Sequence, residues 1–437
     1  VRSVFAAPTL RALAQAIDAV SQQGGAMPLL TRRPQSEAPM PLSPAQARLW
    51  FIDRYEGGSA HYNLPVAWRL RGDFDEVAAE RAFARLVARH ESLRTVFVET
   101  ADGPAQQVLA VVGFQLVRHD LRGMERELAE SQVREAAEAD ARTPFDLKSA
   151  PLLRASHWRL ADTEGVLLVN LHHIAADGWS MGLIAREFVL QYEAARVGLG
   201  DPLPPLALQY ADYAHWHQQR LQSGSEAVVQ LAWWSRQLAD LPPSHALPLD
   251  HPRPKRQSFE GAVHRVRLDA DAAQALRHIA ERNQATLFMV LHATLSLLLA
   301  RNSGSGDVVL GAPVANRTHA DLANVVGLFV NTLVLRTEVW GHASFDALLR
   351  HVRDVNLQAQ IHGNVPFEAL VESLRPVRDA AITPLFQIML SMDALVAGGS
   401  VEPPELPGLQ LEPLGQARGA AKFDLSFNVT ESNDGGL

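Results

Sequence analysis

The fold is decided at the stretch Val166-Leu167-Leu168-Val169-Asn170-Leu171-His172-His173-Ile174-Ala175-Ala176-Asp177-Gly178-Trp179-Ser180. It begins after Gly165 as an unbroken apolar run with β-branched residues, which predicts a buried strand. A helical pattern starts at about Ser180, and its apolar residues are spaced for one face at Leu183, Ile184, Phe188 and Tyr192. Two histidines therefore stand where a rigid strand gives way to a loop. Such a position holds a side chain firmly and still presents it to a substrate.

The histidine pair divides into two roles. Successive residues of a strand point to opposite faces, so we expect one of His172 and His173 to face the core and the other a cleft. An imidazole titrates near pH ~6.5 and can accept a proton at neutral pH. Asp177 is placed to orient a ring or to neutralise an arginine. The residues alone leave open the alternative that both histidines are structural.

Other chemistries find less support in the sequence. His173 and Asp177 lack a third metal ligand at helical or hairpin spacing, and no His-Glu-x-x-His pattern occurs, so we predict no metal site. The glycine-rich segment 304–307 has no following Lys-Ser/Thr, which favours a turn over a phosphate loop. The sequence contains neither a Gly-x-Ser-x-Gly elbow nor a cysteine, so it offers no obvious nucleophile. We therefore expect direct transfer between two substrates.

Composition sets the broad class. The 437 residues are too many for one ordinary core, so we expect two lobes. The formal charge of −8, without a basic patch, argues against nucleic acid as a partner. The absence of cysteine excludes disulfides and fits a cytoplasmic location. The longest apolar segment, 287–300, is too short to span a membrane, and Val1 reads as an internal cut without a signal peptide.

Hydrophobic periodicity predicts the elements. Residues 9–22 are expected to form a helix capped by Thr9, and residues 23–40 a linker rich in Gly, Pro, Gln and Ser. From 41 to 240 we expect an α/β lobe with a mixed sheet. Its elements are a helix capped by Ser43, a strand at 64–70, a helix at 75–90, a strand after Arg94, a helix at 125–141, strands at 152–160 and 166–172, and a helix from 180 to 196.

A proline-rich stretch marks the expected boundary. Prolines between residues 241 and 254 preclude a helix and argue against a central strand. A second lobe, 241–437, is expected to follow, and it looks cut before its natural end. Its elements are strands at 263–268, 307–311, 328–336, 385–391 and 424–429, and helices at 271–282, 286–301 and 344–359.

Residues 172–178 resemble the His-His-x-x-x-Asp-Gly motif of the acyltransferase superfamily that includes chloramphenicol acetyltransferase and the condensation domains of nonribosomal peptide synthetases. Trp179-Ser180 and five further stretches in the expected order point to condensation domains: Ser43–Trp50, Arg89–Phe97, Tyr210–Trp216, Val326–Thr332 and His362–Glu368. The last family motif, at 378–385, is only partly kept. The segment from Phe5 to Ala14 resembles the last helix of a carrier domain, so residues 1–22 would end an upstream carrier.

The resemblance implies two chloramphenicol acetyltransferase-like lobes that form a V-shaped pseudodimer with a central tunnel. An upstream carrier would bring a donor aminoacyl or peptidyl thioester, and a downstream carrier the acceptor aminoacyl thioester whose α-amine attacks it. The phosphopantetheine arms of these carriers, and no cofactor of the domain's own, would hold the substrates. An adenylation domain would be a neighbouring partner.

The resemblance also implies roles for individual residues. His173 would act as general base or as a hydrogen-bonding partner of the amine, and Gly178 would let backbone approach the reacting groups, its N–H a candidate oxyanion donor. His172 would be structural. Asp177 would point away from the substrate and pair with an arginine, with Arg94 or Arg89 as candidates. The residues assigned to the tunnel are Trp179, Ser180 and Asn331.

Subtype and rivals follow from the same motifs. An intact Asp-Gly-Trp-Ser, and no extra His-His motif ahead of Leu42, favour a domain that joins an L-donor to an L-acceptor. The rival interpretations are a catalytically silent condensation-like docking module and a coenzyme A-dependent acyltransferase. The intact His173 and Asp177 argue against the first, and the carrier-like segment before residue 23 argues against the second.

Overall fold

The computed structural model describes residues 9–12, 14, 15, 18, 29–34, 38–222, 224–377, 379–393, 406–414 and 421–437 of the chain. Half of the predicted helix at 9–22, and residues 23–28 and 35–37 of the predicted linker, therefore lie outside the described residues.

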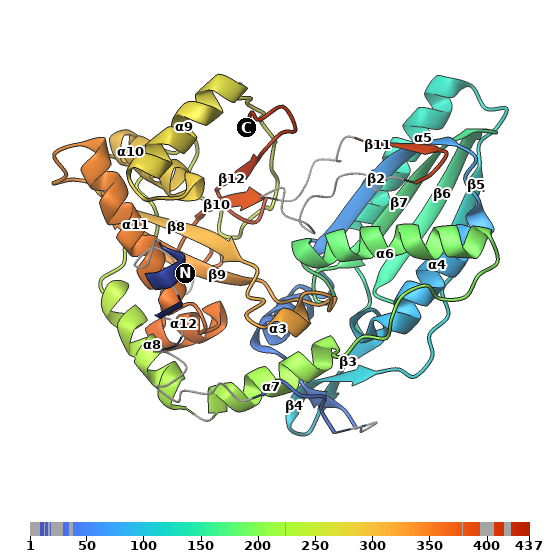
Figure 1. The fold of residues 1–437 in the computed structure, drawn as a ribbon, viewed down its shortest axis with the longest axis horizontal. Helices are drawn as coiled ribbons and strands as arrows, with labels where there is room; N and C mark the ends of the chain where they lie inside the picture. Colours follow the sequence, from blue (N-terminus) through green and yellow to red (C-terminus); the bar gives the residue numbers. More distant parts are fainter. Residues whose placement is uncertain are drawn as a thin grey trace.

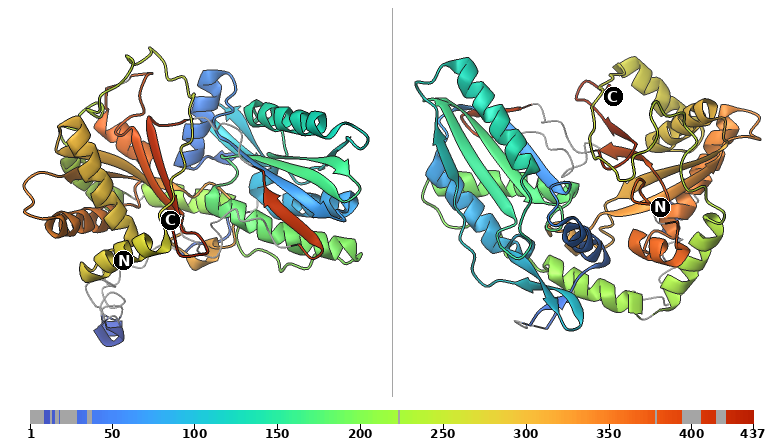
Figure 2. Two further views of the ribbon diagram at one scale, coloured as in Figure 1. Left: turned by 90° about the horizontal axis from the view of Figure 1, so that it is seen from above. Right: turned by 180° about the vertical axis from the view of Figure 1, so that it is seen from behind.

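The molecule has two lobes that diverge as a V, with helices α7 (Tyr210–Gln222) and α8 (Ser225–Gln237) running along its base (Figure 1). The view from behind shows the same two arms (Figure 2). We call the arm with the five-stranded sheet the first lobe and the arm with the four-stranded sheet the second lobe.

A five-stranded mixed sheet in the order β11-β2-β7-β6-β5 forms the first lobe. Helices α4 and α6 cover one face and α5 the other (Figure 1). A small sheet, β1-β4-β3, lies at its base. The elements of this part of the chain are β1 (Met40–Pro41), α3 (Pro44–Glu56), β2 (Asn63–Gly72), α4 (Glu76–Arg89), η1 (Glu91–Arg94), β3 (Thr95–Thr100), β4 (Gly103–Val108), β5 (Val117–Asp120), α5 (Arg126–Arg142), β6 (Leu153–Ala161), β7 (Glu164–His172) and α6 (Gly178–Arg196).

The sheet of the second lobe has the order β12-β10-β8-β9 and is also mixed, because β10 pairs parallel with β8 and β12 while β8 and β9 are antiparallel. Its elements are α9 (Ala270–Arg282), α10 (Leu287–Ser303), β8 (Asp307–Val314), η2 (Ala320–Leu322), β9 (Asn331–Glu338), α11 (Phe345–Ile361), α12 (Phe367–Leu374), β10 (Ile388–Asp393) and β12 (Leu425–Thr430).

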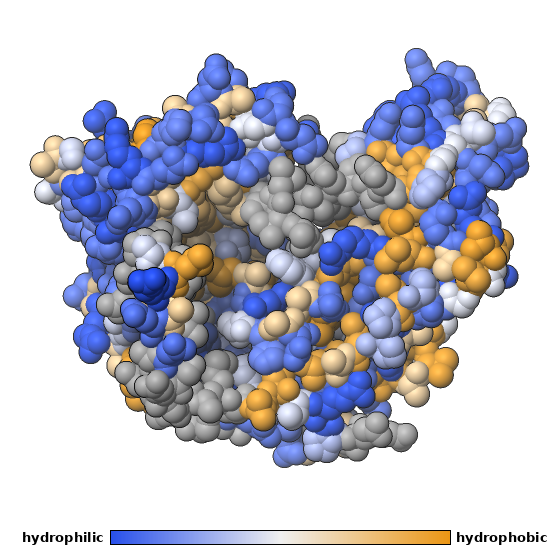
Figure 3. Space-filling model, in the orientation of Figure 1, coloured by the Kyte–Doolittle hydropathy of each residue, from blue (hydrophilic) through white to orange (hydrophobic). Residues whose placement is uncertain are grey.

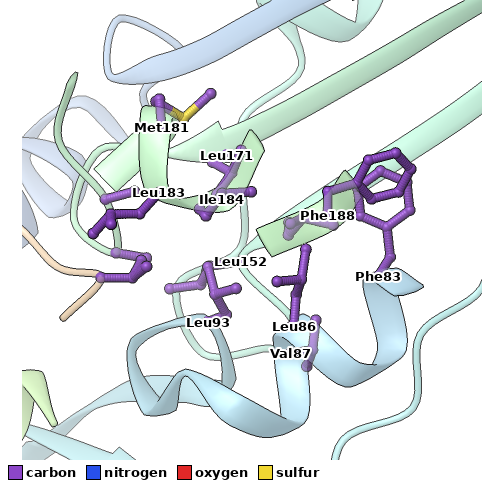
Figure 4. Packing of buried hydrophobic residues seen from close by; sticks show 14 of the residues in the cluster. Phe83, Leu86, Val87, Leu93, Leu152, Leu171, Met181, Leu183, Ile184 and Phe188 are labelled. Atoms are coloured by element: carbon purple, nitrogen blue, oxygen red, sulfur yellow. The ribbon is translucent and has the colours of Figure 1, made fainter. Parts of the chain in front are cut away.

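Strand β7 is apolar throughout because both faces of the sheet are covered. Leu167, Val169 and Leu171 pack with α4 and α6 in one core, while Val166 and Leu168 pack with α5 in another. Figure 4 shows part of the first of these cores, with labelled side chains of α4, α6 and β7 packed together. The alternation continues past the core and sets the directions of His172 and His173.

The two lobes exchange segments. Strand β11 (Leu409–Pro413), from the second half of the chain, pairs antiparallel with β2 at the edge of the first lobe's sheet. The segment 322–329 contributes Leu322, Val326 and Phe329 to the first core. In the other direction, Trp234 of α8 packs in the core of the second lobe.

The predicted mixed α/β architecture is confirmed, and nearly every predicted helix and strand exists with small shifts at its ends. The strand predicted at 263–268 is wrong. Its apolar residues Val263 and Val266 are exposed, and only Leu268 exchanges backbone hydrogen bonds, with Leu437. The alternating pattern is present there, but no partner strand lies beside it among the described residues.

Candidate active site

A cavity of about 360 Å³ lies between the lobes. The first lobe lines it with Arg48 of α3, Tyr62 and His173, and the second lobe with residues that include Asn331 and Lys422. In the space-filling view the two arms stand apart and the surface between them is hollowed (Figure 3). The His173 end of β7 therefore reaches a space that neither lobe encloses alone.

The side chain of His173 is half-buried and faces this cavity. Its backbone N–H donates to the carbonyl of Tyr62 at 2.8 Å, and its ring meets the Tyr62 ring edge-on with the centroids 6.4 Å apart. Nδ1 is enclosed without a hydrogen-bond partner among the described residues, so Nε2 is the nitrogen that can meet a substrate. Burial, with a smaller contribution from the nearby Lys422, lowers the pKa of His173 to about 3. The imidazole is therefore neutral at physiological pH.

His172 points the other way. Only 1% of it is exposed, its ring packs edge-on against Phe145, and Nδ1 accepts a hydrogen bond from the N–H of Ile174 at 3.1 Å. Burial, followed by the neighbouring His173, lowers its pKa to about 3. The division of the pair into one buried and one presented histidine agrees with the expectation from strand alternation.

Asp177 is 2% exposed and uses both carboxylate oxygens. It caps α6: Oδ1 accepts from the N–H and the hydroxyl of Ser180, at 2.8 and 2.7 Å. The same oxygen pairs with Arg317 at 3.2 Å, and Oδ2 accepts from the N–H of Phe329 at 3.0 Å. Asp177 thus ties the start of α6 to two segments of the second half of the chain.

Asp177 pairs with an arginine, as expected, but Arg89 and Arg94 were the wrong candidates. Arg89 pairs with Glu187 on α6 at 3.0 Å, and Arg94 donates to the carbonyls of Ala88 and Leu109. Glu187 lies ten residues beyond Asp177, which places it roughly 15 Å along the helix. Arg89, the last residue of α4, therefore holds the middle of α6, while Arg94 binds backbone outside that helix.

Gly178 is the first residue of α6 and is exposed. A Cβ added to it would meet nothing within 4 Å, so no protein packing requires a glycine there. Its N–H, at the first helical position, has no intrahelical partner. Open space therefore lies beside Gly178, although Gly178 is not among the residues that line the cavity with His173.

Trp179 and Ser180 belong to the junction between the lobes and not to the tunnel, which corrects the sequence prediction. The indole N–H of Trp179 donates to the carbonyl of Ala323 at 3.0 Å. The hydroxyl of Ser180 is fully buried, where it donates to Asp177 and accepts from the N–H of Gly327 at 3.1 Å. From the first turn of α6 these two side chains point toward the second half of the chain, away from the cavity.

Asn331 does line the cavity, but its amide is committed to the protein. Nδ2 donates to the carbonyls of Gly363 and Val365 at 3.0 and 2.9 Å, and Oδ1 accepts from the N–H of Phe367 at 3.0 Å. Asn331 therefore fixes the start of β9 against α12 and shapes the cavity wall.

Sequence reasoning missed several charged residues of this region, among them Lys422, which lines the cavity. Arg317 has a 5% exposed side chain and also donates to the carbonyls of Leu322 and Val325, at 2.6 and 2.7 Å. Arg48 and Glu368 pair across the cavity at 3.5 Å. Both of these lie within stretches that carried the family resemblance, Ser43–Trp50 and His362–Glu368, and that was the available signal.

Two further results concern the described part of the chain. No group of three His, Cys, Asp or Glu side chains there is arranged to hold a metal ion. Within the same residues no single helix is long and apolar enough to cross a membrane; α9 and α10 pass that test only as a pair bent by 100°.

Comparison with known proteins gives similarities along the whole chain. Residues 36–437 match the family model of the condensation domain. A linear gramicidin synthase of Brevibacillus parabrevis is 41% identical over 437 residues, which cover 98% of this chain and 6% of that protein. Malpibaldin synthetase of Mortierella alpina is 42% identical over 434 residues, which cover 99% of this chain and 8% of that protein. The chain thus spans less than a tenth of the length of these curated relatives.

Two solved structures have the same fold. The X-domain in a complex with OxyB from teicoplanin biosynthesis superimposes with a TM-score of 0.83 and 30% identity, covering 94% of this chain and 89% of that one. The first condensation domain of the CDA synthetase superimposes with a TM-score of 0.73 and 21% identity, covering 92% of each chain.

The two-lobed chloramphenicol acetyltransferase-like architecture, the presented histidine at the end of β7 and the match over residues 36–437 lead to one assignment. The chain belongs to the condensation-domain family of nonribosomal peptide synthetases.

Proposed function

We propose that this domain forms a peptide bond between two carrier-tethered substrates. The observation that carries the proposal is His173, whose ring lines a cavity built by both lobes while its neighbour His172 is buried. A cavity shared by two lobes suits a reaction in which two substrates arrive separately and meet at one side chain.

The proposed reaction needs no covalent enzyme intermediate. The α-amine of the acceptor attacks the carbonyl carbon of the donor thioester, and a C–N bond forms as the C–S bond breaks. One proton passes from the amine nitrogen to the departing thiolate. The N–H of Gly178, at the first position of α6, is the donor that the proposal assigns to the developing oxyanion.

His173 acts in this proposal by positioning the amine. Its pKa of about 3 makes it a weak proton acceptor but leaves the ring neutral, and in the tautomer with the proton on Nδ1 its Nε2 accepts a hydrogen bond from an amine N–H. Of the two roles left open by the sequence, this environment favours hydrogen bonding over a general base that stays protonated.

The carriers and the linker complete the proposal. Phosphopantetheine arms of an upstream and a downstream carrier would deliver donor and acceptor, and an adenylation domain would be a neighbouring partner. Residues 1–22 would end the upstream carrier and 23–40 would be the linker, with lobes at 41–240 and 241–437. The linker's Arg33 supports this arrangement, because it pairs with Glu91 and Asp212 at 2.8 and 2.7 Å and thereby fastens the segment to the first lobe. The L-donor, L-acceptor preference stays part of the proposal.

The test is a single-turnover assay with both carriers loaded, read by mass spectrometry of the dipeptidyl thioester. His173→Ala is expected to lower the rate at least about 100-fold, because the variant loses the group that holds the amine. His264→Ala, which removes an exposed histidine outside the cavity, serves as the matched control.

Three outcomes decide between the candidate functions. Undiminished product with His173→Ala would remove this residue from the reaction. Efficient transfer from an acyl-coenzyme A would favour the freestanding acyltransferase. No product from any aminoacyl pair would favour a docking module, and the similarity to an X-domain that forms a complex with OxyB is the observation behind that second candidate.

A further inference from the structure

Lys422 is a cationic residue of the cavity that the function described so far does not use. It lies just before β12 and lines the same cavity as His173. Its ammonium stands over the ring of Tyr62, with Nζ 4.6 Å from the ring centroid. Tyr62 in turn meets the ring of His173 edge-on. One aromatic ring therefore contacts both the cation and the presented histidine.

The backbone around Lys422 is fixed by the second lobe. Its carbonyl accepts hydrogen bonds from Gln257 at 2.9 Å and from Thr383 at 3.3 Å, while the N–H of Ala421 donates to the carbonyl of Phe259 at 2.9 Å. The position of the ammonium is thus set by packing and not by an ion pair.

Among the residues that the structure describes, no carboxylate pairs with Lys422. The nearest acid in sequence, Asp424, is taken by Arg253 and by His245, whose Nε2 lies 2.9 Å from Oδ2. Burial, with a smaller effect of Arg48, lowers the pKa of Lys422 to about 8, so the side chain is still mainly charged at neutral pH. An uncompensated cation in a partly enclosed space acts over a longer range than an exposed ion pair.

The other ionisable groups that line the cavity include two close pairs. Arg48 and Glu368 neutralise each other at 3.5 Å, and Glu56 lies 3.3 Å from Nδ1 of His61. Tyr62 is neutral, because burial raises the pKa of its hydroxyl. Of the cations that line the cavity, Lys422 acts most strongly on His173, followed by Arg48.

We propose that Lys422 is an electrostatic positioning residue that keeps both the imidazole of His173 and the attacking α-amine uncharged. The part of this inference that concerns the α-amine rests on the proposed peptide-bond formation. A fixed positive charge disfavours a second one nearby, so the ammonium form of the acceptor is rejected and the reactive free amine is favoured. A free α-amine titrates near pH ~8, and a neighbouring cation enlarges its uncharged fraction at neutral pH.

The experiment compares pH–rate profiles between pH 5.5 and 8 in the single-turnover assay, for the wild-type domain, Lys422→Met and Lys422→Arg. Removing the charge is expected to shift the acidic limb of the pH–rate profile to higher pH by about one unit. Lys422→Arg keeps the charge and is expected to restore the wild-type limb. Lys148→Met, at an exposed lysine outside the cavity, is the matched control and is expected to change nothing.

A second measurement does not depend on catalysis. The ring carbon signal of His173, assigned through His173→Gln, is titrated by NMR in the unloaded domain. The titration is carried to the lowest pH at which the domain stays folded; the wild-type midpoint is expected to lie well below pH 5, and Lys422→Met is expected to raise it by about one pH unit. If the domain forms no dipeptide, this titration still tests the effect of Lys422 on His173.

The outcomes separate the proposal from a structural role. A Lys422→Met variant that folds normally, loses rate equally at every pH and leaves the His173 titration unchanged overturns the proposal. If Lys422→Met unfolds, the charged variant Lys422→Arg is compared with the uncharged variant Lys422→Gln instead. Equal pH–rate profiles for Lys422→Arg and Lys422→Gln would also contradict the proposal.

Discussion

At the scale of single residues, Asp177 joins two functions in one carboxylate. It caps α6, which holds the loop after His173, and it accepts from Arg317 and from the backbone of Phe329. Both Asp177 and the Arg317 side chain are almost completely buried. Removing one partner of such a pair leaves an uncompensated charge, which is strongly destabilising.

We therefore predict that Asp177→Asn lowers the free energy of unfolding by about 3 kcal/mol, because an amide NH2 would face one of the surrounding donors and Arg317 would lose its counter-charge. Urea unfolding followed by circular dichroism measures the change. Asp102→Asn, at an exposed turn, is the control. Unchanged stability together with a purely kinetic defect would show that the carboxylate acts on the reaction and not on the fold.

At the scale of elements, β11 closes the edge of the first lobe's sheet. It brings a segment from the second half of the chain against β2, and Leu409 enters the first core. The edge of β2 would otherwise present unpaired backbone groups. The approach of the two segments is close at Gly72, which has φ of +126° and lies against the carbonyl of Gly408.

Gly72→Ala is predicted to lower the free energy of unfolding by about 2 kcal/mol, because the new Cβ both strains the backbone and collides with the Gly408 carbonyl. Hydrogen exchange of the β11 amides is expected to accelerate. Gly103→Ala provides the comparison: its φ is +112°, but a Cβ there meets nothing within 4 Å, so only about 1 kcal/mol should be lost. Equal effects of both variants would mean that the contact with β11 contributes nothing.

At the scale of the whole molecule, several histidines are buried in the neutral form. His292, in the second lobe, is fully buried between Thr337 and Asn356, and burial lowers its pKa to about 3. His172 and His173 have similar values, and burial lowers the pKa of His217 to about 4. In the unfolded chain these rings titrate near pH ~6.5.

The domain should therefore lose stability in mild acid. Between pH 6.5 and the folded-state pKa the unfolded chain binds more protons, so the free energy of unfolding falls as the pH falls through this window. Each such histidine contributes about 2 kcal/mol of this loss at pH 5. Denaturant unfolding at pH 7.5 and pH 5 measures the slope. His292→Gln should reduce it, while His264→Gln, at an exposed site, should leave it unchanged.

The carboxylates that pair with arginines act below this window. Acids such as Glu130 and Glu226 have pKa values lowered by their arginine partners, Arg69 and Arg220, so their stabilisation is lost mainly below their ordinary range near pH ~4.5. A stability that is flat between pH 7.5 and 5 would contradict the prediction for the buried histidines.

The periodicity of apolar residues predicted most of the elements, since a strand covered on both faces and a helix covered on one leave different spacings in the sequence. It failed at 263–268, where alternation is present without a partner strand. It also could not assign α8 to a core: Trp234 packs in the second lobe although it precedes the proline-rich stretch. Periodicity reports which face is apolar, and not what covers it.

Strand alternation, a local property of β7, was enough to predict that one histidine of the pair is buried and the other presented, and the ordered motifs were enough to identify the family and, through it, His173 as the presented one. Only the tertiary structure decided that Arg317 and not Arg89 or Arg94 pairs with Asp177, a contact that spans 140 positions. It alone turned Trp179 and Ser180 toward the junction of the lobes and brought Lys422 beside Tyr62. Such pairings depend on where the chain returns in space, which no local spacing of residues encodes.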